Sequence, residues 1–156
     1  MKPLAPLPLD HSWPIFGYDG RLNLGSLFNL QELNGHCFES LDDDLLAEHG
    51  IGRWECDLSD GSLIWTDPVF DLFALPRTAR PSRAETVALY QEESRAAMER
   101  LRAHAIRHRR GFTLDTEIRT ARGDSRWMRL LAAPICADGR VVRLQGLKQN
   151  VSHYYR

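Results

Sequence analysis

Two histidines, His104 and His108, have a spacing that could bind a metal ion. They lie four positions apart in a segment of helical periodicity, so their side chains share one face. No third ligand of a familiar motif stands near them, and the flanking residues are basic, as is common at the C-terminal end of a helix. The pattern favours ordinary histidines at a helix end, and we expect no metal.

The sequence lacks the motifs of common catalytic sites. It contains no glycine-rich phosphate loop, no nucleophile elbow and no H-E-x-x-H. Three cysteines, Cys37, Cys56 and Cys136, lie far apart, and a sparse odd number indicates a reducing compartment rather than a disulfide framework. The sequence therefore predicts a protein that is not an enzyme.

Charge and hydropathy limit the partners. The formal charge is -1, and a chain so nearly neutral is not typical of nucleic-acid binders. No apolar run reaches the roughly 18 residues of a membrane span, and no signal peptide is evident. We expect a cytoplasmic protein with no nucleic-acid and no membrane partner.

Large aromatic side chains could line a pocket for a small molecule. They are Trp54, Trp65, Phe70, Phe73, Phe112 and Trp127. Because large aromatics mostly fill protein cores, a filled core is favoured over a binding pocket. The polar groups expected to orient a ligand are Thr116 and Gln145.

Five strands are predicted from alternation and turn signals. Residues 51–58 and 62–66 flank a turn at Ser59-Asp60-Gly61, and residues 127–136 and 141–147 flank a turn at Asp138-Gly139. Residues 112–119 alternate apolar and polar side chains, which predicts a strand with one buried face. Residues 127–136 are apolar on both faces, so both sides of the sheet should be covered.

Helices are predicted between and before these strands. Ser40 should cap a helix that Gly50 ends, and Thr66 should cap a short helix that Pro76 closes. Ser82 and Glu85 form a capping box. A second cap at Ser94 should begin a longer helix that Gly111 stops. The residues expected on its inward face are Ser94, Met98, Leu101, Ala105 and His108.

These elements predict an α+β fold, a five-stranded antiparallel sheet with helices on one face and an N-terminal helical extension. Four prolines, Pro3, Pro6, Pro8 and Pro14, should keep the start of the chain irregular. The same segment is rich in apolar residues, so it should dock on its own domain or on a partner. The N-terminal segment and a second subunit both remain candidates for the cover of the second face.

The ordered motifs resemble the PAS domain family, in particular its PAS fold-3-like subgroup. The first half of the resemblance is G-R-W-E-C-D-L at residues 52–58, then Gly61 and I-W-T at residues 64–66. The second half is E-I-R at residues 117–119, Gly123, R-W-M-R at residues 126–129, Pro134, Asp138-Gly139 and Gly146. The sequence departs from the family pattern at Arg122, at residues 90–93 and at Asn150.

The resemblance divides the chain into an N-terminal extension (1–37), a capping helix (38–50), a PAS domain (51–152) and a C-terminal tail (153–156). Met1 and the unusual first segment favour a stand-alone single-domain protein. In the family a terminal acid often pairs with an arginine, which here implies a signal-transfer pair of Arg129 and Asn150.

The resemblance implies a bacterial-type, non-catalytic signal-transduction module. Such a module would act through homodimerisation or through contact with a signalling protein such as a sensor histidine kinase. The residues expected at the dimer or partner interface are Leu41, Leu45, Leu46, Trp127, Leu131 and Ala133.

The alternative is a small-molecule or haem sensor with a ligand pocket between sheet and helices. Its candidate pocket residues are Trp54, Trp65, Phe70, Phe73, Leu101, Thr116, Ile118 and Leu144, and the haem candidate is His108. Covalent flavin chemistry is not expected, because no cysteine lies in the predicted helices after Asp67. We expect no cofactor, with haem and non-covalent flavin as open alternatives.

Overall fold

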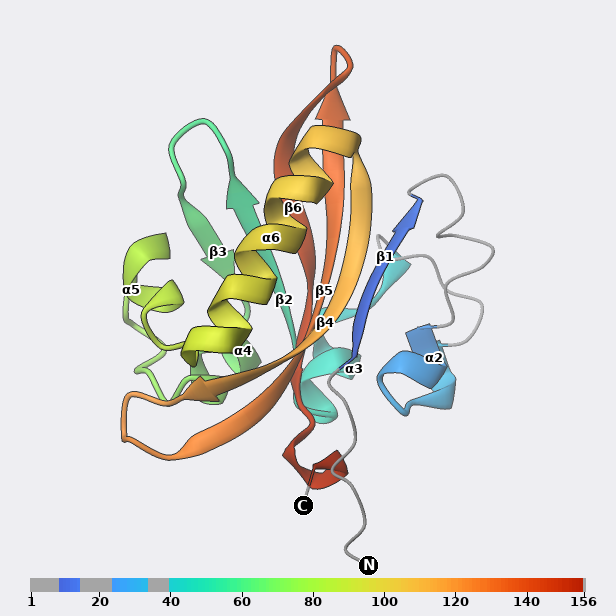
Figure 1. The fold of residues 1–156 in the computed structure, drawn as a ribbon. Coiled ribbons are helices and arrows are strands. Elements are labelled where there is room, and N and C mark those ends of the chain that lie inside the picture. Colours follow the sequence, from blue (N-terminus) through green and yellow to red (C-terminus); the bar gives the residue numbers. More distant parts are fainter. Residues whose placement is uncertain (1–8, 15–23, 34–39, 156) are drawn as a thin grey trace, which may run out of the picture.

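The computed structural model describes residues 9–14, 24–33 and 40–155 and shows a single antiparallel sheet with helices on both faces (Figure 1). The strands are β1 (Asp10–Pro14), β2 (Ile51–Asp57), β3 (Leu63–Trp65), β4 (Arg110–Arg119), β5 (Ser125–Ala137) and β6 (Arg140–Asn150). Their order across the sheet is β1-β4-β5-β6-β2-β3. The α+β fold is confirmed, but the sheet has six strands where the sequence predicted five.

The additional strand, β1, comes from the proline-rich start of the chain. It pairs with β4 from Asp10 opposite Leu114 to Pro14 opposite Arg110. Pro14 is tolerated because β1 lies at the edge of the sheet, where the missing amide hydrogen leaves no strand unpaired. The prediction that the prolines prevent regular structure is therefore wrong for residues 10–14. Pro3, Pro6, Pro8 and Cys37 lie outside the described residues.

The helices are short except for one. They are α2 (Leu24–Leu27), α3 (Asp43–Glu48), α4 (Asp67–Leu72), α5 (Arg83–Val87) and α6 (Glu92–His108), with 3-10 turns η2 (Gln31–Leu33) and η4 (Ser152–Tyr154). Figure 1 shows α6 crossing one face of the sheet. None of the described helices is long and apolar enough to span a membrane.

Some predicted helix ends are confirmed and others are corrected. The capping box of Ser82 and Glu85 is present. Asp42, not Ser40, caps α3, because its carboxylate accepts a hydrogen bond from the amide of Asp44. Helix α6 begins at Glu92, and the hydroxyl of Ser94 instead accepts a hydrogen bond from the amide of Glu117. The helix stops where Arg109 adopts a left-handed φ of 55°, before Gly111.

The sheet separates two apolar clusters. The first cluster lies under α4 and α6 and includes Trp54, Val69, Phe73, Leu101, Ile118, Met128, Leu130 and Leu144. The second cluster lies on the opposite face and consists of Trp13, Leu24, Phe28, Leu30, Leu33, Leu41, Leu46, Ile51, Leu131, Ala133 and Leu147. Strand β5 contributes to both clusters, which confirms its two apolar faces, and the N-terminal residues of this same chain cover the second one.

This cover also corrects the predicted exposure of β4. The polar positions Thr113 and Asp115 were expected to face solvent, yet both are buried. The indole nitrogen of Trp13 in β1 donates a hydrogen bond to the Thr113 hydroxyl over 3.3 Å. The first half of β4 is therefore buried on both sides, because β1 and the N-terminal segment lie against it.

Candidate functional site

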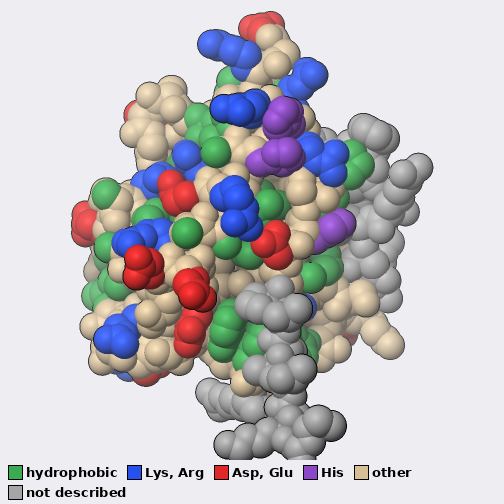
Figure 2. Space-filling model, in the orientation of Figure 1, with side chains coloured by type: hydrophobic (Ala, Val, Ile, Leu, Met, Phe, Trp, Pro, Cys, Tyr) green, Lys and Arg blue, Asp and Glu red, His purple; other side chains and the backbone are tan. Residues whose placement is uncertain are grey.

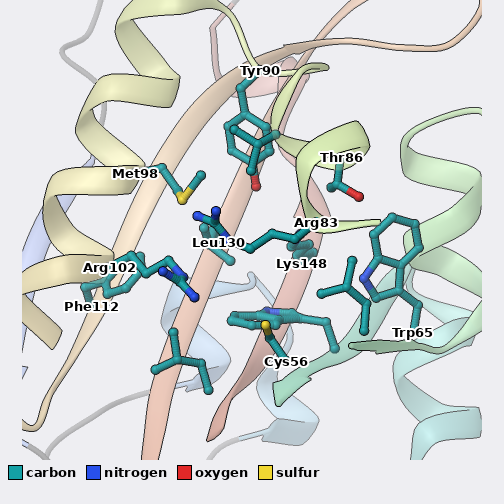
Figure 3. Close-up of a pocket in the computed structure, with 14 residues that line it drawn as sticks. Cys56, Trp65, Arg83, Thr86, Tyr90, Met98, Arg102, Phe112, Leu130 and Lys148 are labelled. Atoms are coloured by element: carbon teal, nitrogen blue, oxygen red, sulfur yellow. The ribbon is translucent and has the colours of Figure 1, made fainter. Parts of the chain in front are cut away.

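A cavity of about 60 Å³ lies between the sheet and helices α5 and α6 (Figure 3). Most of its wall is apolar, with side chains from β2, β3, α6, β4, β5 and β6. The lining residues are Trp54, Cys56, Leu63, Trp65, Arg83, Thr86, Val87, Tyr90, Met98, Arg102, Phe112, Leu130, Leu144 and Lys148. The described lining residues include no carboxylate and no histidine.

Lys148 is the most unusual residue of this pocket. It stands in β6 between Gly52 of β2 and Leu130 of β5, in phase with the inward-facing Leu144. The residue is only 6% exposed. No described residue accepts a hydrogen bond from its ammonium or forms an ion pair with it. Burial of a charge without such a partner is unfavourable, so this position needs an explanation.

Three aromatic rings lie close to the Lys148 ammonium. Its nitrogen lies 5.4, 5.7 and 5.1 Å from the ring centroids of Trp54, Trp65 and Phe73. These rings stabilise a cation only partly. Loss of hydration dominates and lowers the pKa of Lys148 to about 7, with a smaller opposing influence of Cys56. A substantial fraction of the amine is therefore neutral near neutral pH.

Three further polar groups border the cavity. Arg83 forms an ion pair with Glu99 of α6, whereas Arg102 has no ion pair with any described residue. The phenol oxygen of Tyr90 points toward the interior of the pocket (Figure 3). Burial raises the pKa of Tyr90, which keeps it a neutral hydrogen-bond donor. The polar side of the pocket therefore carries positive charge and a hydroxyl.

Gly146 positions the indole that forms one wall. A Cβ at this residue would lie 1.6 Å from the carbonyl oxygen of Leu131 and 2.7 Å from the indole nitrogen of Trp54. Because glycine leaves this space open, the Trp54 nitrogen donates a hydrogen bond to that carbonyl over 3.2 Å. The glycine in β6 thus holds Trp54 flat against the sheet beside Lys148.

Some of the predicted pocket residues line the cavity and others lie in the surrounding core. Trp54, Trp65 and Leu144 line the cavity. Phe73 and Phe70 lie behind Trp65, with ring centroids 5.4 and 5.0 Å from it. Leu101 and Ile118 are buried in the first cluster without lining the cavity.

The two polar residues predicted to orient a ligand do not line this cavity. Thr116 donates its hydroxyl hydrogen bond to the carbonyl of Met128 over 3.3 Å. Gln145 alternates with Leu144 and faces the opposite side of the sheet, beside Arg53 and Asp42. Strand alternation and a backbone acceptor direct these two groups away from the cavity.

The haem candidate His108 lies on the outer surface of α6. It is exposed, and its ring centroid is 4.6 Å from that of His104. Figure 2 shows histidine side chains beside basic ones on this surface. No cluster of metal-ligating side chains occurs among the described residues. The cavity, at about 60 Å³, is also far smaller than the roughly 300–1,000 Å³ of typical cofactor pockets, so it does not fit haem or flavin.

Arg129 and Asn150 do not form the predicted signal-transfer pair. Arg129 donates two hydrogen bonds of 2.8 Å to the carboxylate of Asp115, and a third to the carbonyl of Leu27. Asn150 instead accepts hydrogen bonds from the amide and hydroxyl of Ser152. The two residues point to opposite faces of the sheet, because neighbouring register positions alternate.

Asp115 is the centre of a buried polar network on the second face. Its side chain is 0% exposed, and it also accepts a hydrogen bond from the hydroxyl of Tyr155. Burial and the bond to Asp115 raise the pKa of Tyr155 to about 12, and Asp115 raises the pKa of Arg129. The network joins the N-terminal segment, the sheet and the C-terminal turn.

Most of the predicted interface is occupied within the chain. Leu41, Leu46, Leu131 and Ala133 are buried in the second cluster. Leu45 and Trp127 are half-buried, and Trp127 stacks on Tyr155 with ring centroids 4.2 Å apart. The four buried residues therefore cannot serve as an exposed partner surface, because the N-terminal segment already covers them.

Sequence reasoning missed the charged residues of the pocket. The candidates did not include Lys148, Arg83 and Arg102, because charged side chains in strands and helices usually face solvent. One signal was available for Lys148. It lies four residues after Leu144 in a strand, so alternation alone places it on the same face.

Comparison with known proteins shows a likeness of fold. Neither a protein-family model nor a curated protein matches the sequence. A solved N-terminal domain of a diguanylate cyclase with PAS/PAC sensor from Marinobacter aquaeolei is 14% identical, with a TM-score of 0.63 over 68% of this chain and 99% of that one. A sensory box histidine kinase/response regulator from Burkholderia thailandensis is 17% identical, with a TM-score of 0.61 over 69% and 82%. The PAS domain of the fruit-fly ELK potassium channel is 13% identical, with a TM-score of 0.55 over 76% and 100%.

Proposed function

We propose that this chain, a PAS domain by its fold, is a non-catalytic signal-transduction module that binds a small molecule between its sheet and helices α5 and α6. The observation that carries the proposal is the buried ammonium of Lys148, which has no acceptor among the described residues. Two of the similar structures are described as a PAS/PAC sensor and a sensory box kinase, which supports a sensory role.

The position of Lys148 also supports a route to the end of the chain. Two residues later, Asn150 accepts hydrogen bonds from Ser152, whose hydroxyl accepts one from the amide of Trp127. A ligand that moves Lys148 would therefore act on the strand that leads directly into the C-terminal turn. This link favours the coupling of pocket occupancy to a signalling partner.

The proposal is tested on freshly purified protein by an absorption spectrum and by mass spectrometry before and after denaturation. We expect a small molecule that is released on denaturation. The control is Val87→Trp, which places an indole at a half-buried lining position. A molecule retained equally by this variant would not occupy the pocket, and the absence of any bound or titratable small molecule would contradict the proposal.

A second candidate function is protein interaction in the cytoplasm, with a second copy of this chain or with a signalling protein such as a histidine kinase. It is favoured by Ile64, a large apolar side chain that is 64% exposed on the edge strand β3. An exposed apolar residue on an open strand edge is a typical contact point.

Light scattering on the full chain and on Ile64→Glu tests this second function. A dimer mass that the substitution converts to a monomer mass would support homodimerisation through β3. A monomer mass for the unmodified chain would leave only a different signalling protein as the partner.

A further inference from the structure

Lys148 fulfils the requirements of a recognition group for an anion. The residue is only 6% exposed and borders the cavity, and its ammonium has no hydrogen-bond or ion-pair partner among the described residues. A structural role would be filled as well by methionine, which packs against aromatic rings without loss of hydration of a charge. The retained charge therefore indicates that something absent from the chain itself completes this site.

The other polar groups of the pocket favour a ligand with negative charge. Arg102 borders the cavity with no ion pair to a described residue, and Arg83 is bound by Glu99. With no carboxylate among the described lining residues, the pocket would repel a cation. The Tyr90 hydroxyl adds a donor that points into the same space (Figure 3).

The rest of the cavity wall favours a ligand whose remaining part is small and apolar. Met98, Leu130 and Leu144 are apolar, and the Trp54 indole nitrogen is already bound to the Leu131 carbonyl, which leaves the indole nitrogen of Trp65 as the remaining donor of this wall. The cavity of about 60 Å³ is smaller than the roughly 150 Å³ that admits benzene. A multiply charged phosphate would leave most of its oxygens against apolar groups.

We propose that the pocket binds a compact carboxylic acid with an aliphatic body, its carboxylate on the ammonium of Lys148 and its body between Trp54 and Trp65. Arg102 contributes a second positive charge at the same cavity. This inference rests on the proposed function and adds the chemical class of the ligand.

The proposal makes binding sensitive to pH. The carboxylate requires protonated Lys148, whose pKa is about 7 in the free chain, so binding takes up protons. Affinity for the acid should fall as the pH rises above about 7, by up to tenfold per unit. The titratable and charged groups that face Lys148 are Cys56, Tyr90, Arg83 and Arg102. Cys56→Ser shows whether the thiol contributes to the pH dependence.

The experiment compares acetate with acetamide, which has the same shape without the charge and, with four non-hydrogen atoms, is small enough for the cavity. Calorimetry on the full chain should show acetate binding at least about tenfold more tightly than the amide. Lys148→Met should remove this preference, whereas Arg77→Met, an exposed arginine far from the pocket lining, should keep it. Proton uptake, measured in buffers of different ionisation enthalpy, gives a readout that needs no variant.

Three outcomes would overturn the inference. If the amide bound as tightly as the acid, the pocket would still take small molecules, but not through a carboxylate. If inorganic phosphate bound more tightly than acetate, the site would recognise a polyanion. If acetate produced no heat and no proton uptake up to about 10 mM, the inference would fail, while a co-purified neutral molecule would keep the proposed function.

Discussion

Each face of the sheet holds a cationic side chain, but only one of these two side chains has an ion-pair partner among the described residues. On the second face Arg129 is bound by Asp115 and by the Leu27 carbonyl, and every component comes from this chain. On the pocket face Lys148 has three aromatic rings nearby and no acceptor among the described residues. The structure of this chain explains the paired cation, whereas the unpaired one is the basis of the ligand site that we propose.

The largest effect is expected from breaking the pair on the second face. Arg129→Met leaves the fully buried Asp115 carboxylate without its guanidinium partner. We expect the free energy of unfolding to fall by about 3–5 kcal/mol, measured by urea denaturation. The exposed pair of Arg77 and Asp71 is the control, and Arg77→Met should lower the free energy of unfolding far less than Arg129→Met. Equal losses would mean that burial does not distinguish the two pairs.

The unpaired cation, Lys148, should have the opposite effect on stability, because its charged form destabilises the folded chain. Folding lowers the pKa of Lys148 from 10.5 to about 7. The burial of its charge therefore lowers the free energy of unfolding by the full amount below pH 7, and by progressively less as the pH rises to 10.5. Relative to Lys148→Met, the unmodified chain should therefore gain about 1.4 kcal/mol of unfolding free energy per pH unit above about 7. Urea denaturation of both proteins between about pH 6 and 9 measures how the difference in their unfolding free energies depends on pH. A constant difference would show that Lys148 is not desolvated in the unliganded chain.

Gly146 leaves room for the Trp54 indole, whose nitrogen donates a hydrogen bond to the Leu131 carbonyl beside this glycine. Gly146→Ala should displace that indole and lower the unfolding free energy by about 1–3 kcal/mol. Near-ultraviolet circular dichroism should report the change of the tryptophan environment. An unchanged spectrum would contradict the close approach on which the pocket wall depends.

The smallest effects come from a matched pair of tyrosines. Tyr155→Phe removes a hydrogen bond to buried Asp115 and should lower the unfolding free energy by about 1–2 kcal/mol. Tyr90→Phe removes a hydroxyl that has no hydrogen-bond partner among the described residues and should change the unfolding free energy by less than about 0.5 kcal/mol. Thermal unfolding of both variants checks the order. A larger loss for Tyr90→Phe would indicate that the pocket hydroxyl supports the fold.

Much of the fold was predictable from local patterns. Helical spacing predicted most of the inward face of α6, since Met98, Leu101 and Ala105 are buried and Ser94 is half-buried. His108, expected on the same face, is exposed at the end of the helix. Both hairpins followed from turn residues, and Gly61 and Gly139 adopt the expected positive φ. These features depend on neighbours in the sequence, so periodicity and turn chemistry suffice to predict them.

The parts that were not predictable depend on distant contacts. Strand β1 exists only because β4 offers it an edge, and Asp115 is buried only because that segment lies over it. Arg129 was assigned to Asn150 by resemblance, although the register of the sheet places Asp115 opposite it. Lys148 was overlooked because its residue type suggests solvent, while its position in β6 places it inside.

The internal cover of the second face has an evolutionary consequence. Leu131, Ala133 and Leu147 are buried by residues more than eighty positions earlier, including Leu24 and Phe28. A descendant that lost the early segment would expose those strand positions to water and would come under selection to replace them with polar residues. In an alignment of such descendants, the loss of the early segment and the polarity of these three positions should therefore vary together.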